Sequence, residues 1–178
     1  MRKPRVEPPV LRGADGPFTN QPGGTVEGYG AINLNSLGTH TLANAGTIAP
    51  GMSIGTLSIT GNLGQAASGI LGIEIGAVDS NDLLVVSGSA ALDGVIQVAL
   101  LGGYVPSVGD SFRVLNYGSH TGSFQGAVTV AGGDVTWSVQ SLEGFTQITV
   151  EQVPAPGVGL FGAAGVTLLG IAHRRRRA

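Results

Sequence analysis

The 178-residue chain is predicted to be all-β, with parallel β-helix-like coils that lead into a β-sandwich-like end piece. Glycine is abundant, at 31 residues, and charged residues are only 11% of the chain, against roughly 25% in ordinary soluble domains. Between residues 18 and 152, short Val-, Ile- and Thr-rich segments alternate with turn residues, and no helical period is sustained. Some of these motifs also recur at a fixed spacing.

The recurring motifs predict coils that stack on one another. Gly24-Thr25-Val26 and Gly46-Thr47-Ile48 lie 22 residues apart, and so do Gly72-Ile73-Glu74-Ile75 and Gly94-Val95-Ile96-Gln97. A period of about 20 to 25 residues with strand-forming side chains is typical of such stacked coils. Hairpin-like spacing around Gly132-Gly133-Asp134 predicts antiparallel strands in the C-terminal half.

The predicted strands share a two-residue alternation or a short apolar run between Gly, Asp, Asn or Ser. They are "GTLSITG", "GILGIEIG", "DGVIQVAL", "DLLVVSG", "SFRVLNY", "GAVTVAG", "DVTWSVQ" and "FTQITVE". Trp137, the single tryptophan, lies in one of these strands and is expected in the core.

The chain divides into three predicted segments. Residues 1–17 form a basic, proline-rich leader, residues 18–152 form the β-rich body, and residues 153–178 form a C-terminal signal. The leader has no apolar run of about 7–15 residues, so it cannot serve as a secretory signal peptide. Because the tail indicates export, we expect the true start, with further repeats, to lie upstream.

Charge and cysteine content exclude several classes of function. Residues 13–172 contain ten acidic residues and one basic residue, Arg113, which gives this stretch a net charge of −9. A body this acidic repels phosphates, so nucleic acid is not an expected partner. The chain has no cysteine, which excludes disulfides, thiol catalysis and cysteine-based zinc sites.

Candidate catalytic and metal-binding residues have simpler structural interpretations. Ser53 lies in a G-x-S-x-G sequence, but a strand pattern follows it where a nucleophile elbow requires a helix, so a turn is expected. Asp79 and Asp82 frame a short polar turn without the remaining ligands of a calcium loop. His40 and His120 have no partner at ligand spacing. We expect no catalytic residue, no metal and no cofactor.

The C-terminal tail predicts a membrane span. Sixteen uncharged residues, 157–172, would form a helix of about 24 Å, slightly short of the ~30 Å hydrocarbon core. His173 and four arginines follow in the segment 173–178 (Arg174, Arg175, Arg176 and Arg177). Under the positive-inside rule they stop transfer and hold the C-terminus in the cytoplasm.

The tail resembles the PEP-CTERM sorting domain of exported bacterial proteins. The resemblance rests on Val153, Pro154, Ala155 and Pro156, followed by the apolar span and the terminal arginines. It implies recognition by an exosortase near the proline motif, at the inner membrane, and a final place in the cell envelope or outside the cell. The family context also implies a link to exopolysaccharide or biofilm. The chain departs from the family at Ala155, where the motif has Glu.

A second resemblance covers about residues 20–130. The segments "GTIAPGMSIGTLSITGNL" and "NDLLVVSGSAALDGVIQVAL" are similar to the β-rich passenger segments of autotransporter-like surface proteins. This resemblance implies a parallel β-helix and a surface location.

The two resemblances and the lack of a catalytic constellation favour a non-enzymatic cell-surface or extracellular-matrix structural protein. Its expected partners are an exosortase, the membrane and an exopolysaccharide. Two alternatives stay open. One is a surface polysaccharide-active enzyme, for which Glu74, Asp79 and Asp82 are the plausible acidic cluster. The other is a glycan-binding adhesin without turnover.

Overall fold

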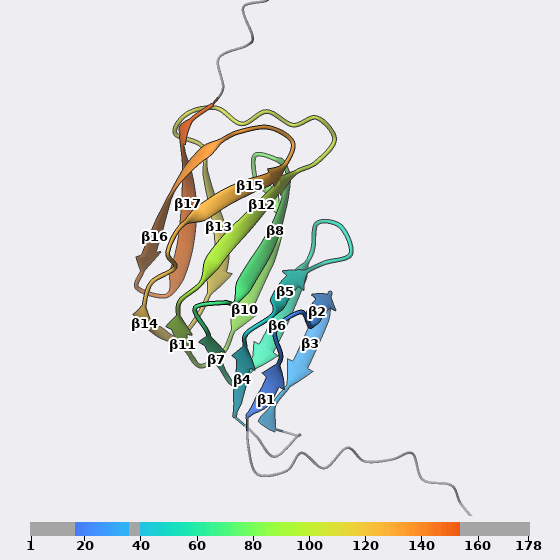
Figure 1. The fold of residues 1–178 in the computed structure, drawn as a ribbon, viewed down its shortest axis with the longest axis vertical. Coiled ribbons are helices and arrows are strands. Elements are labelled where there is room, and N and C mark those ends of the chain that lie inside the picture. Colours follow the sequence, from blue (N-terminus) through green and yellow to red (C-terminus); the bar gives the residue numbers. More distant parts are fainter. Residues whose placement is uncertain (1–16, 36–39, 154–178) are drawn as a thin grey trace, which may run out of the picture.

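The computed structural model describes residues 17–35 and 40–153, and every helix or strand assigned within them is a β-strand. The strands fall into three stacks (Figure 1). Stack A contains β1 (Phe18–Asn20), β4 (Thr41–Asn44), β7 (Asn62–Gln65), β11 (Ser89–Leu92) and β14 (Ser119–Gly122). Stack B contains β2 (Thr25–Gly28), β5 (Thr47–Pro50), β8 (Ile70–Ala77), β12 (Val95–Leu100) and β15 (Ala127–Ala131). Stack C contains β3 (Gly30–Asn33), β6 (Thr56–Thr60), β10 (Leu83–Val86) and β13 (Ser111–Asn116), and the short β9 (Ser80–Asn81) pairs with β8.

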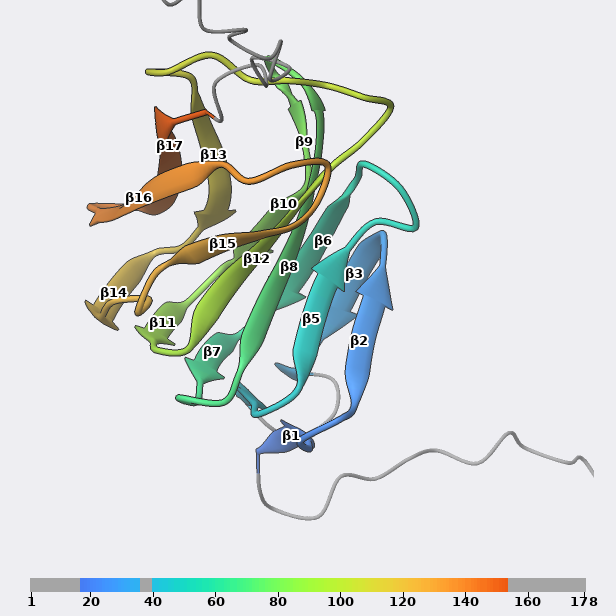
Figure 2. The same cartoon turned by 45° about the horizontal axis from the view of Figure 1, so that its top comes forward.

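The chain visits stacks A, B and C in turn, so these strands make a β-solenoid of about four turns, as predicted. Successive coils pair in parallel within each stack, and Figure 2 shows them following one another from β1–β3 to β14–β15. Buried and partly exposed residues alternate along the central strands, as in β8 and β12. The interior is filled by aliphatic side chains that are less than 2% exposed: Leu42, Ile48, Ile59, Leu71, Ile73, Leu84, Ile96 and Leu115. Each contributes about 1.5–3 kcal/mol by burial.

Stack B confirms one predicted repeat and corrects the other. Thr25 pairs with Thr47, so the first 22-residue repeat is a true coil-to-coil register. The second repeat is wrong, because Gly72 pairs with Gln97, an offset of 25 residues. Gly94 instead lies in the turn before β12, with a φ of 69°. The coil that holds β8 and β9 is longer than the one before it, and matching motifs alone do not reveal this difference.

A ladder of side-chain amides runs inside stack A. Nδ2 of Asn20 donates to Oδ1 of Asn44 at 2.7 Å, and Nδ2 of Asn44 donates to Oε1 of Gln65 at 2.9 Å. The three residues are buried and occupy equivalent positions in consecutive coils. Leu92 takes this position in the next coil, and Nε2 of Gln65 has no partner among the described residues. The ladder therefore links the first three coils and ends there.

An antiparallel hairpin closes the C-terminal end of the solenoid. Strand β16 (Thr136–Leu142) pairs with β15, and β17 (Phe145–Gln152) pairs with β13, so the hairpin bridges stacks B and C. Trp137 is buried, as expected. Its ring packs edge-on against Phe112, with the ring centroids 6.1 Å apart, and its Nε1 donates to Oγ1 of Thr129. The predicted antiparallel strands are confirmed. They differ from the predicted sandwich-like end piece, because they extend the sheet of the solenoid itself.

The amide ladder predicts an unequal response to two substitutions. Asn44→Ala removes the central amide and leaves buried polar atoms of Asn20 and Gln65 without their partner, so we expect the free energy of unfolding to fall by about 2–4 kcal/mol. Gln147→Ala removes an amide–amide bond of similar chemistry, from Gln147 to Gln140, that is exposed to solvent. We expect this control to cost less than about 0.5 kcal/mol. Urea unfolding of both variants measures the difference, and equal losses would contradict the role of the ladder.

Candidate ligand-binding groove

The predicted sorting residues lie at or beyond the end of the described chain. Val153 is half-buried and packs against the core directly after β17. Pro154, Ala155 and Pro156 lie outside the described residues, as do the predicted span 157–172 and Arg174, Arg175, Arg176 and Arg177. In the part of the chain that the structure describes, no helix is long and apolar enough to cross a bilayer.

Ser53 lies in a turn, as the sequence predicted. The turn connects β5 to β6, and the side chain of Ser53 is exposed. Gly51 begins the turn with a φ of 87°, and a Cβ there would collide with the carbonyl oxygen of Ser53. The glycines of the G-x-S-x-G sequence therefore serve the backbone conformation of this turn.

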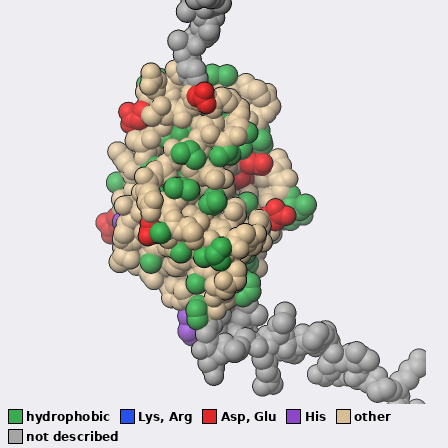
Figure 3. Space-filling model, viewed as in Figure 1, with side chains coloured by type: hydrophobic (Ala, Val, Ile, Leu, Met, Phe, Trp, Pro, Cys, Tyr) green, Lys and Arg blue, Asp and Glu red, His purple; other side chains and the backbone are tan. Residues whose placement is uncertain are grey.

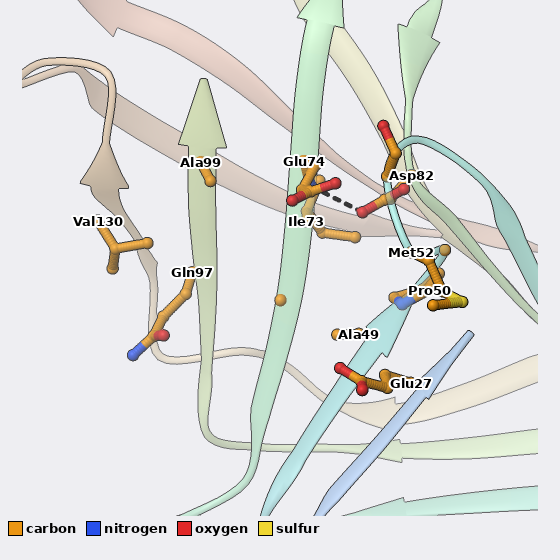
Figure 4. Close-up of a pocket in the computed structure, with 13 residues that line it drawn as sticks. Glu27, Ala49, Pro50, Met52, Ile73, Glu74, Asp82, Gln97, Ala99 and Val130 are labelled. Carbon is orange, nitrogen blue, oxygen red and sulfur yellow. Dashed lines mark hydrogen bonds between the residues drawn. The ribbon is translucent and has the colours of Figure 1, made fainter. Parts of the chain in front are cut away.

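A groove of about 270 Å³ lies on the outer surface of stack B. Its polar lining includes Glu27 on β2, Glu74 on β8 and Gln97 on β12. Figure 4 places Glu74 and Glu27 on opposite sides of Ala49, with Gln97 and Met52 at the flanks. The groove thus collects side chains from coils that are distant in sequence and adjacent in the solenoid.

Small residues create the hollow. Ala49, Gly72 and Ala99 occupy outward positions on the three adjacent strands β5, β8 and β12, where larger side chains would fill the space. At Gly72 an added Cβ would make only ordinary contacts, of 3.6 Å to the Cβ of Ala49 and 3.7 Å to the carbonyl oxygen of Ile48. The fold therefore does not require glycine at position 72.

Asp82 forms the inner wall of the groove beside Glu74. Its carboxylate is 1% exposed and accepts two backbone hydrogen bonds, both at 2.8 Å. The amide of Gly55 donates to Oδ1, and the amide of Glu74 donates to Oδ2, the bond drawn in Figure 4. The amide of Asp82 in turn donates to the carbonyl oxygen of Glu74. Burial raises the pKa of Asp82 to about 6; the two backbone bonds oppose this shift and the nearby Glu74 carboxylate adds to it. Asp82 therefore fastens β8 to the turn before β6.

The acidic cluster predicted from sequence is only partly assembled. Glu74 and Asp82 line the same groove, whereas Asp79 is exposed in the turn after β8 with a φ of 61°. Among the described residues, no group of three His, Asp or Glu side chains could hold a metal ion. Glu27 and Gln97 were missed by sequence reasoning, and the register of stack B, in which Glu27 pairs with Ala49, was the signal that could have found Glu27.

The histidines lie at the surface and outside the groove. His40 is exposed, and its Nδ1 lies 2.9 Å from Oδ1 of Asn35. His120 is partly exposed beside the ring of Tyr117.

The charge around the groove is negative. The described residues include nine acidic side chains and one Lys or Arg, which is Arg113. The guanidinium group of Arg113 lies over the ring of Phe145, with its Cζ 3.9 Å from the ring centroid, where β13 pairs with β17. The face of the molecule in Figure 3 shows Asp and Glu side chains but no Lys or Arg. Like charges around a recess focus its field, so this groove favours cations.

Comparison with known proteins gives one informative similarity. A stretch of 80 residues is 38% identical to the adhesin BmaC autotransporter of Brucella suis biovar 1 (strain 1330). The match covers 40% of this chain and 2% of that protein, so the matched stretch corresponds to a small part of the adhesin. The chain matches no protein-family model.

The buried Asp82 predicts that stability depends on pH. The pKa of Asp82 is about 6 in the folded chain and 3.8 in the absence of its surroundings, so the folded state binds the proton more tightly. The stabilising contribution is complete below about pH 4 and is lost as the pH rises through 6, with a total of at most about 3 kcal/mol. Urea unfolding at a series of pH values measures this slope. Asp82→Asn is expected to remove it, and an unchanged slope in that variant would contradict the assignment.

Proposed function

We propose that this chain is an exported, surface-exposed, adhesin-like structural protein without enzymatic activity. The observation that carries the proposal is the β-solenoid body combined with its similarity to part of an autotransporter adhesin. A solenoid can present a long outer face, because each coil packs only against the coils next to it. Such a surface suits a protein that holds or contacts other material outside the cell.

The C-terminal segment supplies the route to the surface in this proposal. The last strand ends at Gln152, and the segment from Val153 to Pro156 follows it directly. An exosortase recognises this segment while the apolar span 157–172 lies in the inner membrane and the four arginines remain in the cytoplasm. Processing then leaves the body in the cell envelope or outside the cell, in contact with exopolysaccharide.

A surface polysaccharide-active enzyme is the second candidate. The observation that favours it is that Glu27 and Glu74 line one groove, since sugar hydrolysis uses a pair of carboxylates. Assays on uronic-acid and neutral polysaccharides test this candidate, with Glu74→Gln as the control. Asp82→Ala is a poor control, because it would break the backbone contacts that fasten β8. Turnover that disappears in Glu74→Gln would favour the enzyme over the structural protein.

Cell location tests the leading proposal. The full chain, expressed behind a secretory signal peptide in a bacterium that carries an exosortase, is expected in the envelope and medium fractions. Deletion of residues 153–178 is expected to abolish processing and envelope retention. A body that remains in the cytoplasm, and is indifferent to this deletion, would contradict the proposal.

Two further variants test the division of labour within the tail. Neutral residues in place of Arg174–Arg177 remove charges that each resist insertion by about 2.5–3.5 kcal/mol, so we expect this protein to be released with its tail uncut. Replacing Pro154 and Pro156 by Ala lets the segment continue a helix, so we expect anchoring without processing. Mass spectrometry of the membrane-bound and released proteins distinguishes these outcomes. Identical behaviour of the two variants would show that the roles are wrongly assigned.

A further inference from the structure

Gly72 lies at the floor of the groove, and the local backbone and packing do not require glycine there. Its φ is not positive, and a Cβ at this position meets no atom closer than 3.6 Å. Glycine weakens the interior of a strand, and it often marks a place where a ligand approaches the backbone closely. Gly51, at the rim of the same groove, differs because its φ of 87° and the nearby Ser53 carbonyl require glycine. The open floor at position 72 therefore leaves room for a ligand to approach the backbone of β8.

The position of the groove disfavours an extended peptide as that ligand. Peptides commonly bind a sheet by adding a strand to a free edge. The groove instead lies across β5, β8 and β12, and β8 and β12 each pair with strands on both sides within stack B. Recognition must then come from side chains, namely the carboxylates of Glu27 and Glu74 and the amide of Gln97.

These side chains define the chemistry of the ligand. Carboxylates accept hydrogen bonds from hydroxyl and ammonium groups and attract positive charge, while an amide both donates and accepts. A uronic-acid polymer would bring negative charge against Glu27 and Glu74. A ligand that carries hydroxyl groups and protonated amines satisfies the charge and the hydrogen-bonding groups together.

We propose that the groove binds a protonated amino sugar within a polysaccharide. The sugar ring lies over Ala49 and Gly72, between Glu27 and Glu74. One of these two carboxylates binds the ammonium group, and the other carboxylate and Gln97 bind hydroxyl groups. This assignment extends the proposed function. It depends on that function only because the exported protein would meet the polysaccharide outside the cell. The cell-location experiment and a binding experiment on purified protein can therefore fail independently.

Calorimetry on the purified full chain with two matched probes tests the ligand. A glucosamine oligomer and its fully N-acetylated form share the ring and differ in charge. We expect the glucosamine oligomer to bind, with an affinity that falls as salt is added, and the acetylated oligomer to bind at least about tenfold more weakly. Equal affinity for the two oligomers would overturn the proposal. Spermidine binding as tightly as the glucosamine oligomer would overturn the role of the sugar.

Matched variants test the site. Gly72→Val fills the floor, and Gly64→Val adds the same side chain on the outer face of β7, where a Cβ meets nothing closer than 3.9 Å. The double change Glu27→Gln with Glu74→Gln is compared with Glu143→Gln with Glu151→Gln, which alters net charge equally at exposed positions outside the groove. We expect the affinity of the two groove variants for the glucosamine oligomer to fall about tenfold or more. Both control variants should bind it with the affinity of the unmodified chain. Full affinity in Gly72→Val, or equal losses in the two double variants, would overturn the site. Thermal melts establish that each variant is folded.

Discussion

Parallel hydrogen bonding between successive coils is the constraint on which the rest of the structure depends. Each coil places one strand in each stack, and a coil alone could not bury its apolar side chains or pair its backbone. Side chains along β8 and β12 alternate, so that one set packs in the interior and the other set lies on the outer surface. A shift of one residue would exchange the two faces, so the Leu and Ile residues inside enforce the register.

The two ends of the solenoid are held by different interactions. Near the first coils, the amide ladder of Asn20, Asn44 and Gln65 places polar groups inside the core, where each bond depends on the register of stack A. A buried amide tolerates misalignment poorly, because an unpaired group loses its solvation without compensation. At the other end, apolar packing of Trp137 on Phe112 and the pairing of β17 with β13 close the sheet. The ladder therefore favours one register among the first coils, and the hairpin covers the edges of β13 and β15 that the last coil would otherwise expose.

The sequence predicted the parts of this fold that depend on local pattern. The alternating segments that become β6, β8 and β12 and the buried position of Trp137 are correct, because side-chain periodicity determines both. Coil length was not predictable from motif matching, and Gly72 therefore pairs with Gln97 three residues from the expected partner. The groove depends on this register. Glu27 and Glu74 are 47 positions apart in the chain, and only the stacked coils bring them to one surface.

The location of the groove follows from the unusual third coil. Strand β8 is eight residues long and folds back into β9, which brings Asp82 under the turn after β5. The buried carboxylate of Asp82 accepts one backbone bond from Gly55 in this turn and one from Glu74 in β8, and so fastens the turn to β8. The turn supplies Met52 and Ser53 to the rim. Since the inward residues of every strand are committed to packing, changes in chemistry can accumulate only at outward positions and in turns. In this molecule, the turn fastened by Asp82 and the open floor at Gly72 border the same groove. The buried carboxylate of Asp82 therefore shapes the groove, while the carboxylates of Glu27 and Glu74 remain available to a ligand.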